Sequence, residues 1–277
     1  MRAFLSRFVR HRPAVLGLVI LLMVTAFALL APLIHPASPF GLVGRPFQPP
    51  FGEYLFGTDQ LGRDLAAALL YGARTTLLIG LIATTIAVLV GVTIGGLAGY
   101  YGGRLDAALM RLTEIFQTIP FFLFAILLLA VLTPSIVNVI IAIAVVSWPP
   151  MARLVRGDFL AMRDREFVLA CVSMGMSNAR IILRHILPNT LSSIIVTASL
   201  MVATAILIES SLSFLGLSDP NVMSWGFIIG AGRTAIRTAW WVCAIPGIAI
   251  LLTVMSINLV GEGLNDALNP RLAKGGR

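Results

Sequence analysis

The sequence REFVLACVSMGMS at residues 165–177, continued by RHILPN at 184–189, is a polar island in a very apolar chain. Long apolar runs flank it on both sides. It predicts two short helices hinged near Gly175, because glycine permits a tight turn. Ser177 is placed to cap the second helix, and Pro188 is placed to end it. A helical hairpin between membrane spans suits docking onto a soluble partner.

An apolar face of this hairpin would fit a groove on that partner. An ordinary interfacial helix lying on lipid is the alternative, and the residues alone do not separate the two interpretations. The face comprises Phe167, Val168, Cys171, Val172 and Met174.

The rest of the composition indicates a polytopic α-helical membrane protein. Of 277 residues, 58% are hydrophobic and only 12% are charged, which a soluble domain could not bury. The net charge of +8 would suggest nucleic acid in a soluble protein, but here the positions of the basic residues set membrane orientation. The two cysteines, Cys171 and Cys243, lie in different contexts, so no disulfide is expected.

About six spans are predicted from apolar runs near 20 residues long, with the basic N-terminus leading into a retained first span. We divide the chain into residues 1–34 (N-terminus and first span), an outer segment at 35–74 and a core domain with the other five spans at 75–277. The core holds the polar-island loop at about 163–189 and an outer loop at about 209–240. The expected spans are 14–34, 75–100, 107–132, 136–154, 191–207 and 241–260.

Orientation follows from the basic residues. With the N-terminus inside, the inner segments hold 15 of the 20 Lys and Arg residues, a strong positive-inside bias. Both termini and the polar island are therefore expected to be cytoplasmic. The outer segments hold Arg45, Arg63, Arg74, Arg233 and Arg237.

The polar island is similar to the EAA loop of ABC importer permeases at Ala170, Gly175, Leu187 and Pro188. It differs at Leu169, where the motif has Glu, and at Cys171, where it has Ala. The resemblance implies that this loop fits a cleft on a cytoplasmic ATPase and transmits its closure. The implied coupling residues are Glu166, Leu169, Ala170, Cys171, Gly175, Met176, Ser177, His185, Leu187 and Pro188.

The likeness covers nearly the whole chain, which resembles the second, shorter permeases of the dipeptide, oligopeptide and nickel group. It rests on FGTDQLGRD (56–64), YGAR (71–74), SLSFLGL (211–217), SWG (224–226) and NLVGEGLNDALNPR (258–271), in addition to the loop. It implies an all-α, type I importer permease in the bacterial cytoplasmic membrane. Peptides are the expected cargo; nickel or metal chelates, glutathione or another small solute are alternatives.

The same resemblance implies the partners. These are a second permease that completes a heterodimer, two cytoplasmic ATPases that bind ATP and Mg, and a periplasmic or lipid-anchored substrate-binding protein. The chain itself is expected to bind no cofactor, metal or nucleic acid, and it has no Gly-x-x-x-x-Gly-Lys-Ser/Thr phosphate loop. No nucleophile–base pair occurs in the predicted third to sixth spans, so the sequence does not support an intramembrane enzyme. An ATPase-independent channel or secondary transporter is a remote alternative.

The outer segment carries its own polar cluster. Thr58 or Asp59 is expected to cap a helix that begins near Gln60, after which Arg63 and Asp64 can pair with neighbours. An anionic-ligand site is possible chemically, because Arg binds carboxylates, but a structural role is favoured. The resemblance places a binding protein on this face, at Thr58, Asp59, Gly62, Arg63 and Asp64.

Three charges near the spans complete the candidates. Arg111 and Glu114 are three residues apart, so they share a helix face and can pair, with a structural role favoured over gating. Glu209, near the outer end of the fifth span, can cap, pair with Arg233 or Arg237, or face the path, and these roles stay open.

Proline and glycine add two expectations about the spans. Kinks are expected at Pro120, Pro149, Pro150 and Pro246. The small-residue face at Gly91, Gly95 and Gly99 predicts close internal helix packing.

Overall fold

The structure is a computed structural model that describes residues 8–9 and 11–268. Within that range the chain is helical, with two isolated β-bridges in the outer segment. Five helices are long and apolar enough to cross a membrane, or six if the bent pair α4 and α5 counts as one span. The predicted number of spans is therefore confirmed for the described residues.

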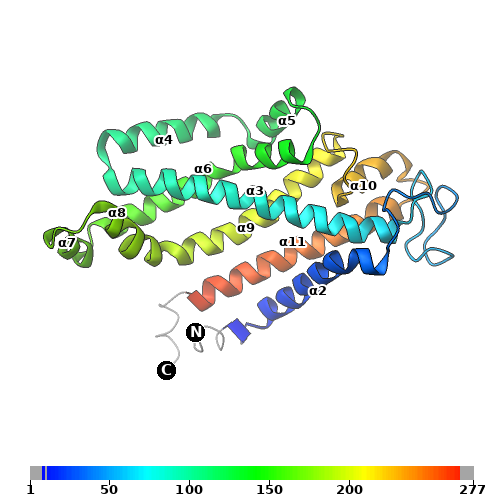
Figure 1. The fold of residues 1–277 in the computed structure, drawn as a ribbon, viewed down its shortest axis with the longest axis horizontal. Coiled ribbons are helices and arrows are strands. Elements are labelled where there is room, and N and C mark those ends of the chain that lie inside the picture. Colours follow the sequence, from blue (N-terminus) through cyan, green and yellow to red (C-terminus); the bar gives the residue numbers. More distant parts are fainter. Residues whose placement is uncertain (1–7, 10, 269–277) are drawn as a thin grey trace.

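The long helices form an elongated bundle (Figure 1). The hairpin of α7 (Glu166–Ser173) and α8 (Asn178–Ile181) lies at one end, and the outer segment before α3 lies at the other. The principal helices are α2 (Arg12–Ile34), α3 (Leu65–Tyr101), α6 (Ile136–Arg163), α9 (Leu187–Phe214) and α11 (Trp241–Leu268). Several run well beyond their predicted spans, because their polar ends continue the same helices past the apolar runs.

The packing of α3 against α6 is the most extensive helix contact. Glycines on one face of α3 make it possible. A Cβ added at Gly95 would lie 2.2 Å from the carbonyl oxygen of Ala152, and one at Gly91 would lie 2.7 Å from the Met151 Cβ. Gly99 likewise meets Phe159. The predicted internal role of this small-residue face is confirmed.

The predicted third span is broken. α4 (Gly103–Thr118) and α5 (Phe121–Val131) meet at Ile119 and Pro120 with a bend of 81°. Proline cannot donate a backbone hydrogen bond, so the helix ends where the N–H is missing. In contrast, α6 continues through Pro149 and Pro150, and α11 continues through Pro246.

The outer loop at 209–240 contains a helix that the sequence did not predict. α10 (Trp225–Gly232) is followed by the 3₁₀ turn η2 (Arg233–Ala235). It packs against α9 and α11, with Gly226 against Ser210 and Ser213, and Gly232 against Val242. Its eight residues are too short and too rich in glycine to show a helical period in the sequence.

Candidate functional site

The polar island folds as predicted into a hairpin, with α7 (Glu166–Ser173) turning at Gly175 into α8 (Asn178–Ile181). The turn is a Schellman motif. The N–H of Met176 donates to the Cys171 carbonyl (3.1 Å), and the N–H of Gly175 donates to the Val172 carbonyl (2.9 Å). Gly175 has φ +74°, a left-handed conformation that favours glycine.

The start of α8 corrects one expectation. The Ser177 hydroxyl makes no capping bond, although Ser177 is the N-cap residue. Instead Asn178 accepts a hydrogen bond from the Tyr100 hydroxyl at 3.0 Å. Because Tyr100 belongs to the end of α3, this contact fixes the hairpin against the bundle.

Pro188 does not end the second helix of the hairpin, which corrects the prediction. α8 continues through a π-turn, η1 (Ile182–Ile186), into α9, so residues 178–214 form one rod. Pro188 has no N–H to donate to the carbonyl four residues back, at Arg184. The π-turn therefore includes the residue whose carbonyl lacks its α-helical partner. The wider turn also brings Ile181 and Ile186, both fully buried, to the same side.

The two faces of α7 have different environments. Val168 and Cys171 are buried in a core cluster with Met151, Val155 and Phe159 of α6. Their assignment to a docking face was therefore wrong. The other face stays open, with Val172 54% and Met174 67% exposed. Phe167 and Leu169 are exposed beside them. The hairpin thus has one face anchored to the bundle and one apolar face without a partner within the described chain.

The remaining coupling residues surround this open face. Glu166, Ala170, Gly175, Ser177 and Pro188 are exposed, whereas Met176, His185 and Leu187 are partly buried. Asn189 donates a side-chain hydrogen bond to the His185 carbonyl at 2.6 Å.

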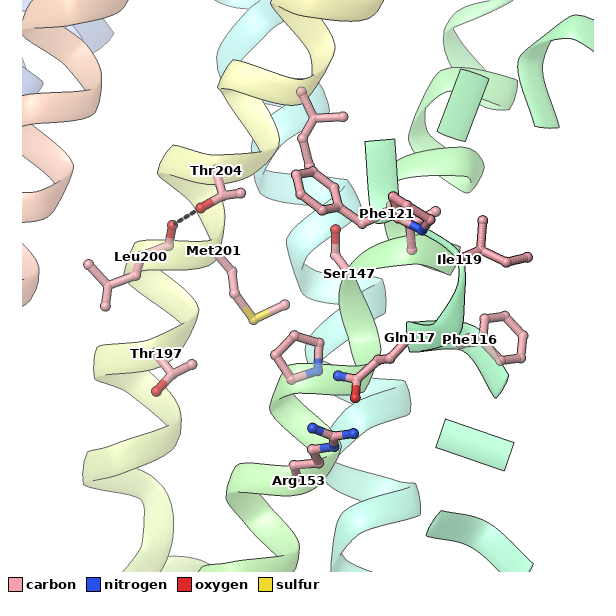
Figure 2. A pocket seen from close by; sticks show the side chains of 14 residues that line it. Phe116, Gln117, Ile119, Phe121, Ser147, Arg153, Thr197, Leu200, Met201 and Thr204 are labelled. Carbon is pink, nitrogen blue, oxygen red and sulfur yellow. Dashed lines mark hydrogen bonds between the residues drawn. The ribbon is translucent and has the colours of Figure 1, made fainter. Parts of the chain in front are cut away.

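A cavity of about 580 Å³ lies between α4, α5, α6 and α9 (Figure 2). The sequence did not predict it, because its lining comes from distant segments. Most of the lining is apolar, including Phe116, Phe121 and Met201. Its polar side chains are Gln117, Ser147, Arg153, Thr197 and Thr204. The rod that begins in the hairpin therefore also forms one wall of the cavity.

The outer cluster is held together by its own hydrogen bonds. The fully buried Thr58 hydroxyl donates to the Arg45 carbonyl (2.7 Å) and accepts from the Gln48 N–H (2.9 Å). An Asp59 carboxylate oxygen accepts from the N–H groups of Leu61 and Arg63, which closes a turn. The chain takes a left-handed turn at Gly62, with φ +76°.

The helix after this cluster begins later than predicted. It starts at Leu65, and its cap is Asp64, which accepts from the Ala66 N–H at 2.9 Å. Neither Thr58 nor Asp59 caps it. The Arg63 guanidinium lies 5.0 Å from the centre of the Phe40 ring, which covers one of its faces.

Arg111 and Glu114 pair as predicted, at 3.2 Å, but the two side chains are 79% and 54% exposed. Glu209 takes none of the three expected roles. It is 1% exposed, and its carboxylate accepts from the hydroxyls of Ser213 (2.8 Å) and Ser224 (2.7 Å). Arg233 instead donates to the Phe214 carbonyl. Glu209 therefore ties α9 to the start of α10.

Comparison with known proteins identifies the class. Residues 91–274 match the family of binding-protein-dependent transport system inner membrane components. Residues 1–50 match the N-terminal transmembrane domain of oligopeptide transport permease C. The chain belongs to the first of these families and is a permease subunit of a binding-protein-dependent ABC importer. In this family the ATPase is a separate subunit, so the chain itself is a transport subunit and not an enzyme.

Individual relatives agree with this assignment. The chain is 44% identical over 268 residues to a putative peptide transport system permease protein of Brucella abortus, covering 96% of this chain and 90% of the relative. It is 41% identical over 265 residues to the dipeptide transport system permease protein DppC of Alkalihalophilus pseudofirmus (95% and 87% covered). It is 38% identical over 271 residues to the oligopeptide transport system permease protein OppC of Bacillus subtilis (97% and 88% covered).

Solved structures show the same fold at lower identity. An inward-facing MetNI methionine ABC transporter has a TM-score of 0.60 and 18% identity, covering 73% of this chain and 96% of that one. An amino acid ABC transporter has a TM-score of 0.55 and 15% identity, with 72% and 92% covered. These matches establish the type I importer permease fold.

Proposed function

We propose that this chain imports peptides, as one of two permeases in a complex with two cytoplasmic ATPases and a substrate-binding protein. The names of the relatives support peptides as the cargo. ATP and Mg would bind to the ATPases. The basic residues at the hairpin end of the bundle support a cytoplasmic position for the hairpin and both chain ends.

The open apolar face of α7 carries the proposal for coupling. Val172 and Met174 are exposed at the polar end of the bundle, whereas Val168 and Cys171 anchor the same helix to α6. A partner that binds the open face would therefore move the whole hairpin as one unit, because the hairpin is already packed on the bundle. The coupling residues named above, from Glu166 to Pro188, form this unit.

The rod of α8, η1 and α9 supplies the path for the movement. From Asn178 to Thr204 the rod would extend about 39 Å at 1.5 Å per residue, and Thr204 lines the cavity. Closure of the ATPases would displace the hairpin, and the rod would shift one wall of the cavity. The outer cluster from Thr58 to Asp64, at the other end, would face the binding protein.

The experiment is co-purification of a tagged chain with its co-expressed partner subunits. Val172→Asp together with Met174→Asp places two charges on the open face, so the ATPases should be lost while the second permease is retained. Leu55→Asp is the matched control, because Leu55 is an equally exposed apolar residue at the opposite end. Retention of the ATPases by the hairpin double variant would contradict the proposal.

A further inference from the structure

Arg153 is an unpaired cation on the wall of the cavity. It belongs to α6, ten residues before that helix ends at Arg163. Its neighbour Arg156 is held by Asp106 at 2.5 and 2.7 Å. Arg153 has no hydrogen-bond or ion-pair partner among the described residues, and it lines the cavity. The two arginines lie three residues apart on α6, but only Arg153 lines the cavity.

A second polar group on the cavity wall also lacks a partner. The Oε1 atom of Gln117 is buried without a hydrogen bond. Figure 2 shows the side chains of Gln117, from α4, and Arg153, from α6, directed toward one another at the same end of the cavity. Buried polar atoms are nearly always bonded, so an unsatisfied one that lines the same cavity as a free guanidinium indicates a position for a ligand.

The chemistry of the two groups selects the ligand. A guanidinium offers parallel N–H donors whose geometry matches a carboxylate. The Gln117 amide can add a further donor or an acceptor. The remaining wall is apolar, with Phe116, Phe121 and Met201. A matching solute carries one carboxylate and apolar side chains.

We infer that Arg153, together with Gln117 of the same cavity wall, receives the C-terminal carboxylate of a peptide during its passage through the cavity. This inference rests on the proposed function and adds a specificity-determining residue within the membrane domain. The apolar wall accepts varied side chains, whereas the charge requires a carboxylate. Selection would then occur in the permease as well as in the binding protein.

The test uses the complete importer in proteoliposomes, with the binding protein saturated by either a dipeptide or its C-terminal amide. ATP-driven uptake by each variant is divided by wild-type uptake of the same peptide, which cancels any discrimination by the binding protein. Arg153→Gln should lower uptake of the free-acid dipeptide about tenfold, the effect of losing a charge-assisted hydrogen bond, and leave the amide near wild type. Arg153→Glu should lower the free acid further still.

Arg104→Gln is the control, because Arg104 is exposed on the same helix as Gln117 and does not line the cavity. Recovery of the assembled complex by gel filtration checks folding, and Arg153→Lys retains the charge if Arg153→Gln assembles poorly. Equal losses for acid and amide would overturn the inference and assign Arg153 to a contact with the second permease or with lipid. If the wild-type complex imports neither peptide, the proposed cargo itself is wrong, which is a distinguishable failure.

Discussion

Arg156 of α6 holds Asp106 of α4 through two hydrogen bonds, with its Nε at 2.5 Å from one carboxylate oxygen and an Nη at 2.7 Å from the other. The guanidinium side chain is 35% exposed and the carboxylate side chain 15%. This bidentate pair is the main polar link between α4 and the bundle, because α4 otherwise reaches α6 through few buried side chains. Asp106 belongs to the same helix as Gln117, which lines the cavity.

We expect the Arg156–Asp106 pair to stabilise the protein more than the exposed Arg111–Glu114 pair on the same α4. A double-mutant cycle with Arg156→Gln and Asp106→Asn should give a coupling of about 1 kcal/mol, reduced from that of a buried pair because the arginine is partly exposed. The cycle with Arg111→Gln and Glu114→Gln should give less than about 0.5 kcal/mol. Unfolding in detergent measures both, and equal couplings would contradict the expectation.

The contact of α3 with α6 should tolerate no side chain at Gly95. A Cβ there meets the Ala152 carbonyl oxygen at 2.2 Å, so Gly95→Ala must push two backbones apart. Overpacking of this kind costs about 2 kcal/mol. The thermal unfolding midpoint in detergent should fall accordingly. Gly157→Ala is the control, because no atom lies within 4 Å of its added Cβ. A similar midpoint for the two variants would show that the helices have room to separate.

Features that depend on residues close together in the sequence could be predicted. The Gly175 turn and the Arg111–Glu114 pair were predictable, because each depends on residues a few positions apart. The glycine face of α3 was predictable because small residues at a four-residue spacing have few uses other than close packing. The resemblance at the hairpin and at five other stretches predicted the family, which the comparisons confirm.

What the sequence could not supply depends on contacts between distant elements. The cavity joins Gln117, Arg153 and Thr197 from three helices, and no local pattern marks them as neighbours. Arg153 did offer one signal, because a charge within a predominantly apolar helix suggests function. The inward direction of Val168 and Cys171 was missed because α7 is apolar on both sides. Only the position of α6 decides which side is buried.

Glu209 should fix α10 to the bundle through the Ser224 hydroxyl. That hydroxyl donates to Glu209 and accepts from the Phe227 N–H, so it also caps α10. Glu209→Gln keeps an acceptor of the same shape and should change stability little. Glu209→Leu leaves the hydroxyls of Ser213 and Ser224 without their acceptor, at a cost of about 2 kcal/mol.

Limited trypsin digestion measures the local effect of these substitutions, because Arg233 and Arg237 follow α10 and are exposed. Cleavage there should become several-fold faster in Glu209→Leu and stay near wild type in Glu209→Gln. Unchanged cleavage in both variants would mean that the packing of Gly226 and Trp225, and not the carboxylate, holds α10.

The π-turn before Pro188 should set the angle of the hairpin relative to α9. Pro188→Ala restores an N–H that can donate to the Arg184 carbonyl, so the rod can become a regular α-helix. A π-turn holds about one extra residue, and its loss would rotate α8 by about 100° relative to α9. The open face of α7 would then no longer point toward the ATPase that we propose binds it. Uptake per ATP hydrolysed should fall several-fold in the reconstituted importer, although the ATPases still bind.

The control for Pro188→Ala is Asn189→Ala, one residue further along. It removes only a side-chain bond to the His185 carbonyl and should keep most of the coupling. Wild-type coupling in Pro188→Ala would show that the burial of Ile181 and Ile186 alone maintains the π-turn.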